Sequence, residues 1–501
     1  MKSTVKRVLL VLLAVVMILS VISLVACNKN PSDDDKNPSD DNKNPDDGPT
    51  EEQRIPLEGI PDTTYDDAQF HVLEWSANGV DTPGQGWIPW EEIDVQDYSG
   101  EAIDRAVYDR NRAIEEKYGV KITAEYVSVD QGYDNKLRNS VNNQDNLYQL
   151  MTLRTGSIVG FAQEGLLADL NSLDYLHLDQ PWWTQDSIDK FTTGKSLFFA
   201  SSEMLLRDKG ATATMYFNKK IAEDNAESVG DLYALVDNNE WTFENMLDIA
   251  SLVAHDMDGD LQVSSESDMW GIVGQDDPVY FMFCGAGYLF GNIDNEGHVV
   301  NTFGEGDSVE TLMDIFDEMM YSDFYYKTGK DADLFKADHA LFLSRMIKVT
   351  ANNLRDMESD YGILPTPKWD DSQENYYSLV WIHHDSVLGI PVSDDMDMAA
   401  IITEVMSWES YYSVYPKFYD TVLMNRSTRD PESKRMLEIV FQTRTWDPGE
   451  IWDTKSGFHG GEGILRLSGT GSSDIASLWK KYETAVLNRF ETINDWIDTL
   501  S

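Results

Sequence analysis

The first apolar run of the chain covers residues 8–25 and is interrupted only by two serines. Lys2, Lys6 and Arg7 precede it, and a positive patch followed by an apolar run is typical of a secretory signal peptide. The run is almost long enough to span a bilayer, so a retained anchor helix is the alternative interpretation. No second apolar run of spanning length follows, and we therefore expect the rest of the chain to be soluble.

Further along, the pattern of apolar positions alternates between the period of a strand and the period of a helix. Strand, helix, strand and helix in this order predict a parallel sheet with helices on both faces. Ligands of such sheets gather at the carboxyl ends of the strands, here near Trp75, Arg154 and Thr155. The strand patterns cover residues 70–75, 120–126 and 147–153, and the helix patterns cover 102–118, 132–141 and 157–163.

Residues 27–60 contain almost no apolar side chains and repeat a phrase of Lys, Asn, Pro, Ser and Asp. Such a segment cannot bury enough apolar surface to fold, so it predicts a disordered, acidic and extended tether. The whole chain has 39 basic and 88 acidic residues, a net charge of −49. This charge excludes general binding to nucleic acid or to anionic lipid, and it identifies no ligand.

Two cysteines are present, and the first closes the signal peptide. The sequence Leu24-Val25-Ala26-Cys27 resembles the bacterial lipobox. That resemblance implies cleavage before Cys27, acylation of its thiol and new amine, and a location on the extracytoplasmic face of the cell membrane. Cys284 is then alone, so an intramolecular disulfide is excluded.

Short phrases spread over residues 70–450 resemble bacterial extracellular solute-binding proteins of ATP-driven (ABC) importers, in the branch related to maltose-binding protein (family 1). Their order along the chain, together with the lipobox, carries the resemblance. They are AQEGLLADL at 162–170, PWW at 181–183, MYFNKK at 215–220, WTFE at 241–244, YGILPTPK at 361–368 and VLGIPV at 387–392.

The resemblance implies an α/β, two-lobed periplasmic-binding-protein-like fold (type II) with a hinge and an interlobe cleft. It places the first lobe at residues 61–210 plus 375–425 and the second at 211–374 plus 426–501. The crossings near Thr212 and Tyr376 would be the hinge strands.

Fourteen tryptophans point to the ligand class. Sugar rings stack their C–H faces on aromatic side chains while fixed polar groups bind the hydroxyls, so a mono- or oligosaccharide is expected. The alternative for each single tryptophan is a place in the core. As ligand-binding residues we predict Trp75, Arg154, Trp270, Tyr288 and Trp446.

Asp256, Asp258 and Asp260 stand at alternate positions, as in the first half of an EF-hand calcium loop. Leu261 occupies the position where that loop has glycine, and Ser267 occupies the position of its last carboxylate. The alternatives are a structural calcium site and an acidic surface turn.

Enzyme motifs are incomplete in this chain. No Gly-x-Ser-x-Gly elbow and no phosphate-binding loop occur, and the glycine-rich phrase at 459–463 has no nucleophile to serve. The adjacent His383, His384 and Asp385 would point in different directions on a strand, which disfavours one shared metal ion.

We therefore predict a monomeric substrate-binding lipoprotein of an ABC importer, without enzymatic activity and without a required cofactor, that delivers its solute to a membrane permease. A secreted glycoside hydrolase, which needs only two well-placed carboxylates, and a carbohydrate-sensing surface protein are the alternatives.

Overall fold

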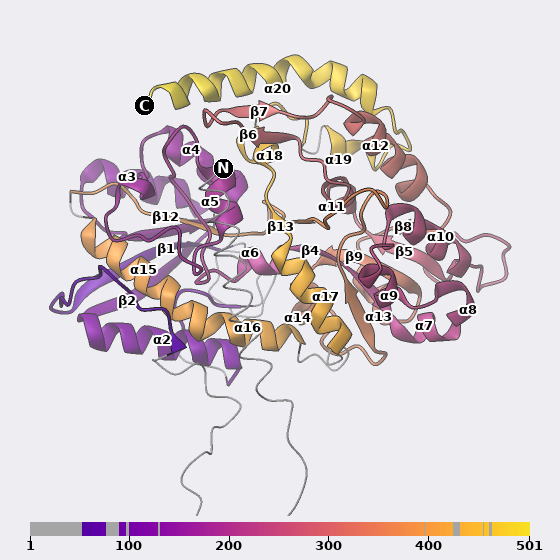
Figure 1. The fold of residues 1–501 in the computed structure, drawn as a ribbon, viewed down its shortest axis with the longest axis horizontal. Helices are drawn as coiled ribbons and strands as arrows, with labels where there is room; N and C mark the ends of the chain where they lie inside the picture. Colours follow the sequence, from indigo (N-terminus) through magenta and orange to yellow (C-terminus); the bar gives the residue numbers. More distant parts are fainter. Residues whose placement is uncertain are drawn as a thin grey trace, which may run out of the picture. The chain divides into compact units, whose positions relative to one another are not determined.

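The computed structural model describes most of the chain beyond the tether, and Figure 1 shows its fold as a ribbon. The predicted signal peptide, Cys27 and the tether as far as residue 52 lie outside the described residues. Among the helices that are described, none combines the length and the apolarity needed to cross a bilayer. The described residues are 53–76, 90–96, 100–128, 131–394, 396–423, 431–453, 455–459 and 463–500.

The first sheet has four strands in the order β12-β3-β1-β2. β1 (Ala68–Trp75) pairs in parallel with both β2 (Val120–Val127) and β3 (Leu150–Leu153). β12 (Val387–Gly389) returns from a distant part of the chain and pairs antiparallel with β3. The parallel arrangement predicted for the first three strands is confirmed, and the residues that end β1 and β3 share one edge of the sheet.

Helix α2 (Ala102–Tyr118) has the bounds that its apolar spacing predicts. It ends at Gly119, whose φ of 59° lies in the left-handed region that glycine adopts without strain. The N–H of Gly119 donates to the carbonyl oxygen of Glu115, and the chain enters β2 at the next residue. The two helices that follow β2 and β3, α3 (Tyr133–Asn143) and α4 (Thr155–Gln163), are also those expected from the sequence.

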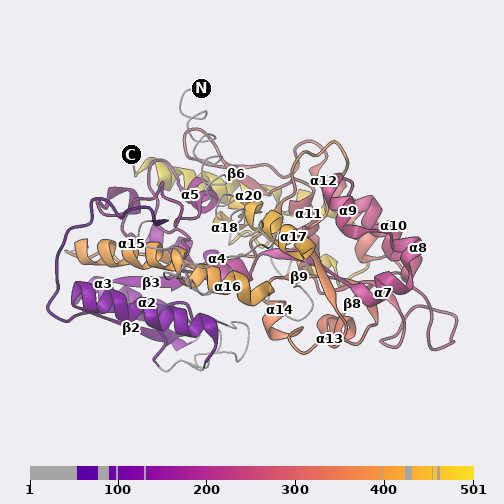
Figure 2. The same ribbon diagram turned by 60° about the horizontal axis from the view of Figure 1, so that its bottom comes forward.

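Two long helices from the later part of the chain complete this lobe. α15 (Asp397–Tyr412) and α16 (Val414–Leu423) pack on each other and on α2, and Figure 2 shows the three helices side by side. The first sheet is therefore built from two chain segments that are separated by more than two hundred residues, as the predicted return of the chain requires.

The second sheet has five strands in the order β10-β4-β9-β5-β8. β5 (Trp270–Gly274), β8 (Tyr325–Lys327) and β9 (Ala340–Met346) are parallel. β4 (Ala213–Asn218) is antiparallel to β9, and β10 (Tyr361–Leu364) is antiparallel to β4. The carboxyl ends of β5, β8 and β9 therefore lie at the edge where β4 begins.

Side-chain caps start two helices of the second lobe, within the phrases at 215–220 and 241–244. The Asn218 side chain accepts a hydrogen bond from the backbone of Ile221 and begins α7 (Lys219–Asp224). The Thr242 hydroxyl likewise accepts from Asn245 and begins α10 (Phe243–Val253).

Three chain segments lie side by side between the two sheets, and we call them the crossing segments: residues 207–213, 376–386 and 443–447. Thr212 forms an antiparallel bridge with Val380, and the N–H of Trp381 donates to the carbonyl oxygen of Ala211 at 3.0 Å. β11 (Ser378–Leu379) pairs in parallel with β13 (Arg444–Thr445). The sequence predicted crossings near Thr212 and Tyr376, and β13 adds a third.

The C-terminal helix α20 (Ile475–Asp498) runs along one side of both lobes (Figure 1). It packs on α12 (Ser308–Asp314), and its Arg489 donates from Nη2 to Gln163 of α4 at 3.2 Å. Its contacts are thus divided between the two lobes, whereas the sequence assigned residues 426–501 to the second lobe alone.

The N-terminal end of the described chain is bound to α15. Arg54 forms an ion pair of 2.9 Å with Glu409, and its guanidinium lies 5.3 Å from the ring centroids of Trp408 and Tyr412. The Tyr412 hydroxyl also accepts from the N–H of Ile55. Residues 54 and 55 therefore belong to the folded part, which corrects the tether boundary predicted at residue 60.

Trp182 and Trp183 are framework residues, because one buried carboxylate binds both indoles. The Trp182 Nε1–H donates to Oε1 of Glu404 and the Trp183 Nε1–H donates to Oε2, each at 2.9 Å. The same carboxylate accepts from the backbone N–H of His177 and lies 3.0 Å from its Nδ1. Burial raises the pKa of Glu404, and the hydrogen bonds from the two indoles oppose that rise.

Replacing Glu404 with alanine is expected to lower the free energy of unfolding by about 2–4 kcal/mol, because two indole N–H groups would stay buried without an acceptor. Chemical denaturation followed by tryptophan fluorescence measures this loss. The matched control is Glu409→Ala on the same helix, which removes a partly exposed ion pair and should cost less than about 1 kcal/mol. Equal losses in the two variants would contradict the role given to Glu404.

Candidate functional site

The carboxyl edges of both sheets meet at the crossing segments. On the first-lobe side, Arg207 donates from Nη1 to the carbonyl oxygen of Trp75, the last residue of β1, at 2.6 Å. On the second-lobe side, the N–H of Lys348, just beyond β9, donates to the carbonyl oxygen of Gly210 at 2.9 Å. The carboxyl ends of β1 and β9 are thereby brought together, as expected for a ligand site between two α/β lobes.

Trp75 and Arg154 meet at this edge, as the sequence predicted. The Arg154 guanidinium lies 5.4 Å from the Trp75 ring centroid, and its Nε donates to the Ser157 hydroxyl at 3.1 Å. The guanidinium of Arg207 lies 5.9 Å from the same ring. Trp75 is only 6% exposed, so its ring holds the two guanidinium groups in place and offers a ligand little surface in this conformation.

A buried ion network fixes the end of β1 to the first crossing segment. Arg207 donates from Nη2 to Glu74 at 2.5 Å, and its Nε lies 3.4 Å from Glu92. Glu92 also accepts from the backbone N–H groups of Leu206 and Arg207 and from the Ser386 hydroxyl. Because all three charged side chains are fully or almost fully buried, removing one of them would leave an uncompensated charge.

The second crossing segment sends three neighbouring polar side chains in different directions. His383 packs edge-on against Trp381, with ring centroids 5.0 Å apart, and keeps access to solvent. His384 places Nδ1 at 2.7 Å from Nζ of Lys348. Asp385 is turned into the protein, where it accepts from the backbone and hydroxyl of Thr155 and from the Trp446 indole. This divergence agrees with the expectation that the three residues do not share a metal ion.

Basic side chains gather at this point, and desolvation favours their neutral forms. Desolvation, followed by the charges of Arg154 and His459, lowers the pKa of His383 to about 4. Desolvation, followed by the charge of Arg345, lowers the pKa of Lys348 to about 7, and Asp277 opposes that shift. The pKa of His384 is lowered as well, first by desolvation and next by Lys348.

Arg345 forms ion pairs with two nearby carboxylates of the second lobe. Its Nη1 lies 3.4 Å from Asp277 and its Nε lies 3.3 Å from Asp331. Both aspartates follow strands of the second sheet and are almost completely buried. Arg345 therefore engages both carboxylates inside the lobe.

Three other residues predicted to bind the ligand lie in different surroundings. Trp446 is fully buried, with its indole on Asp385 and its ring against Phe191, so neither face is open to a ligand in this structure. Trp270 begins β5, at the edge opposite the crossing segments, where it stacks on Tyr326 at 4.5 Å. Tyr288 is half-buried and stacks on Phe283 at 5.5 Å. We therefore leave Trp446 and Trp270 out of the candidate site, and Tyr288 stays a prediction.

The acidic loop gathers the three predicted carboxylates, with ligand atoms of Asp256, Asp258 and Asp260 within 4.8 Å of one another. Leu261 adopts a φ of 71°, so the sharp turn for which an EF-hand uses glycine is made here by an exposed leucine. The neighbouring Asp268 is fully buried. Its carboxylate accepts from three backbone N–H groups of the loop, which hold its pKa well below the usual range.

Backbone donors also occupy the three aspartates themselves. Asp256 accepts from the N–H groups of Gly259 and Leu261, Asp258 accepts from that of Asp260, and Asp260 accepts from that of Gln262. The carboxylate spacing fits a calcium ion, and these hydrogen bonds fit an acidic turn, so both alternatives of the sequence remain.

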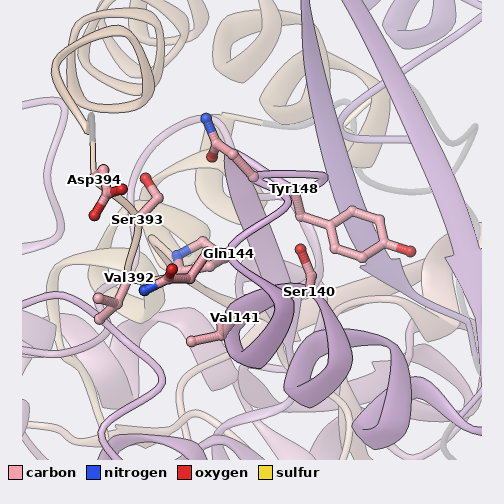
Figure 3. A pocket seen from close by; sticks show the side chains of 9 residues that line it. Ser140, Val141, Gln144, Tyr148, Val392, Ser393 and Asp394 are labelled. Atoms are coloured by element: carbon pink, nitrogen blue, oxygen red, sulfur yellow. The ribbon is translucent and has the colours of Figure 1, made fainter.

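A small pocket of about 210 Å³ opens at the opposite edge of the first sheet. Figure 3 shows Val392, Ser393 and Asp394 on one side of it and Ser140 and Tyr148 on the other. It lies next to the amino end of β3, and its volume is below the roughly 300–1,000 Å³ of ordinary ligand pockets. We assign it no role in solute binding.

Sequence reasoning missed most charged members of the site: Glu74, Glu92, Arg207 and Lys348. One signal was available for Arg207. It stands in an Arg-Asp-Lys triplet between apolar residues, and charges in such a position are buried only when they are paired. Their partners come from remote segments, which a single sequence does not reveal.

Comparison with known proteins gives a clear result for the fold only. No protein-family model matches this chain, and no curated protein matches it by sequence. Solved structures do match it. An ABC substrate-binding protein from Listeria monocytogenes in complex with cycloalternan superposes with a TM-score of 0.51 at 15% identity, covering 86% of this chain and 99% of the other.

A cyclo/maltodextrin-binding protein complexed with maltotetraose superposes with a TM-score of 0.52 at 13% identity, covering 85% of this chain and 97% of the other. Almost the full length of each neighbour is matched, including both lobes. The chain therefore has the type II, two-lobed α/β fold of ABC solute-binding proteins, as the sequence predicted.

Proposed function

We propose that this chain is the substrate-binding lipoprotein of an ABC importer. It captures a small polar solute, a mono- or oligosaccharide, in a cleft between its lobes and delivers it to a permease in the membrane. The observation that carries the proposal is the meeting of both carboxyl strand edges at the crossing segments, around Trp75, Arg154, Lys348 and His383. The sugar complexes of the two structural neighbours support the same ligand class.

The mechanism follows from the arrangement of the polar groups. Each lobe supplies part of the site, Arg154 from the first and Lys348 from the second, so a solute that contacts both binds a closed form better than an open one. The crossing segments are the places where such a rotation would be absorbed. The closed form is then the state that the permease recognises.

A saccharide that binds the purified full chain is expected to raise its melting temperature, because the ligand binds only the folded state. Solution scattering with saturating ligand should show a smaller radius of gyration. Recovery of the saccharide unchanged after incubation separates a binding protein from a glycoside hydrolase, which would release product. A tight ligand that leaves the scattering profile unaltered would disprove closure.

Substitution of Trp75 with alanine should weaken binding of that saccharide by about 1–3 kcal/mol in isothermal titration calorimetry, because Arg154 loses the ring that supports it. Trp270→Ala is the matched comparison, since it removes a buried tryptophan at the far edge of the second sheet and should leave the affinity unchanged. A weaker affinity in the Trp270 variant alone would return Trp270 to the binding site.

The lipid anchor is a proposal from the sequence, since Cys27 lies outside the described residues. Cys27→Ser should block acylation and cleavage at this position, because the thiol that receives the lipid is absent. Metabolic labelling with a radioactive fatty acid and fractionation of cells measure both effects. Mature protein of unchanged size that still carries the labelled chain would exclude Cys27 as the anchor.

We also propose a structural calcium ion in the loop of Asp256, Asp258 and Asp260. Calcium added to metal-free protein should raise the melting temperature, and Asp258→Ala should remove that increase because one of three charged ligands is lost. Asp224→Ala, which removes an exposed carboxylate on α7, should keep it. Identical melting curves with and without calcium would support the acidic turn instead.

A further inference from the structure

Arg154 differs from the other arginines around the crossing segments. Arg207 is paired with Glu74, Arg345 with Asp277 and Asp331, and Arg444 with Asp208 at 3.1 Å. The Arg154 side chain is half-buried, and within the described part of the chain it makes no ion pair. The protein has 88 acidic and 39 basic residues, so carboxylates that could pair with this arginine are abundant.

The position of Arg154 is fixed from several sides. Its guanidinium lies over Trp75, and its Nε is bound to Ser157. The turn that follows it is held on the second crossing segment, because Asp385 accepts from the backbone of Thr155 and the N–H of Gly156 donates to Ile382 at 3.3 Å. An arginine that is held in this way by neutral contacts has terminal N–H groups aimed at a fixed place.

The groups next to the Arg154 guanidinium are also bases. His383 follows Ile382 directly and keeps access to solvent, and His384 contacts the Lys348 ammonium at 2.7 Å. Lys348 comes from the second lobe, so the basic groups extend from one lobe to the other across the second crossing segment. Because desolvation lowers the pKa of His383 to about 4 and that of Lys348 to about 7, His383 is neutral near neutral pH and Lys348 is only partly charged.

The carboxylates on the neighbouring segments are bound by groups other than Arg154. Asp385 is enclosed by Thr155 and Trp446, and Asp277 and Asp331 are bound to Arg345. A half-buried guanidinium that has no carboxylate partner is stabilised by a bound anion, because the anion supplies the missing countercharge. A neutral sugar supplies no such charge.

We propose that the solute is an acidic saccharide, and that Arg154, with the neighbouring His383 as a neutral N–H donor, forms the subsite for its oxyanion. A planar carboxylate, as in a uronic acid, would accept two parallel hydrogen bonds from the Arg154 fork, and a phosphate ester would present oxygens of the same charge. This inference rests on the proposed function and assigns the chemical class of the solute.

The test is calorimetric titration of the purified full chain with three sets of probes. The first set contains oligosaccharides of glucuronate, galacturonate and mannuronate, the second contains their neutral hexose counterparts, and the third contains hexose phosphates. An acidic probe is expected to bind at least about tenfold more tightly than its neutral counterpart. Its affinity should fall as salt is added, whereas that of a neutral probe should not.

Arg154→Gln should reduce the affinity for the acidic probe at least about tenfold, to the level of the neutral counterpart, and should leave the neutral affinity unchanged. Arg105→Gln removes an exposed arginine on α2 and is the matched control, with no expected effect on either probe. If Arg154→Gln does not fold, Arg154→Lys keeps the charge without the fork and should give an intermediate affinity for a uronate.

Tight binding of a hexose phosphate alone would support the oxyanion subsite and assign a phosphate to it. A neutral oligosaccharide that binds as tightly as its acidic counterpart, with no effect of Arg154→Gln, would overturn the inference and leave the proposed function standing. Failure of all three sets to bind would overturn the sugar-binding function itself.

Discussion

The ion network around Glu92 is the constraint that fixes the crossing segments on the first lobe, and the rest of the site depends on it. One carboxylate binds the backbone at the start of the first crossing segment, the Ser386 hydroxyl at the end of the second and the Arg207 guanidinium. Arg207 in turn holds Glu74 and the last carbonyl of β1. Buried charges are costly unless all of them are paired, so the network stabilises only the register in which these segments meet.

The same network explains why the candidate site is basic in an acidic protein. Glu74 and Glu92 are paired with Arg207, and Asp277 and Asp331 are paired with Arg345 on the other side. Among the described residues of the meeting edge, Arg154 is the arginine that has no carboxylate partner. The strong negative charge elsewhere on the chain keeps the protein soluble and has no bearing on the local sign at the site.

Local patterns were sufficient to predict the elements of the first lobe from β1 to α4, because each depends on neighbours in sequence. The apolar spacing of α2 and the glycine that ends it fix that helix, and the alternating positions of β2 fix the strand. β13 has only two residues and pairs with a segment about seventy residues away, so no periodicity marks it. Contacts between remote segments were equally hidden at the site. Trp75 ends one predicted strand and Arg154 directly follows another, so both could be found from the sequence, whereas Lys348 contacts His384 only because of the tertiary fold.

Tryptophan is a poor guide to the site for a physical reason. An indole provides a large apolar area and one N–H donor, and both are satisfied equally well by a ligand or by the core. Trp182, Trp183 and Trp446 all bind buried carboxylates through that N–H, and Trp75 supports a guanidinium. The aromatic residues here thus fix the charged groups in position, and the charged groups are what a solute would meet.

Bending of the lobes about the crossing segments would meet little resistance from the segments themselves. β11 and β13 share a ladder of two residues, and Thr212 contributes a single bridge to Val380. Such short pairings tolerate changes of backbone angle far better than the eight-residue ladder between β1 and β2. Helix α20 is a stronger restraint, because it contacts α4 through Arg489 and also packs on α12. A rotation that closes the cleft must therefore keep the two lobes in contact along α20. It changes the distance between the lobes on the side that α20 does not cover.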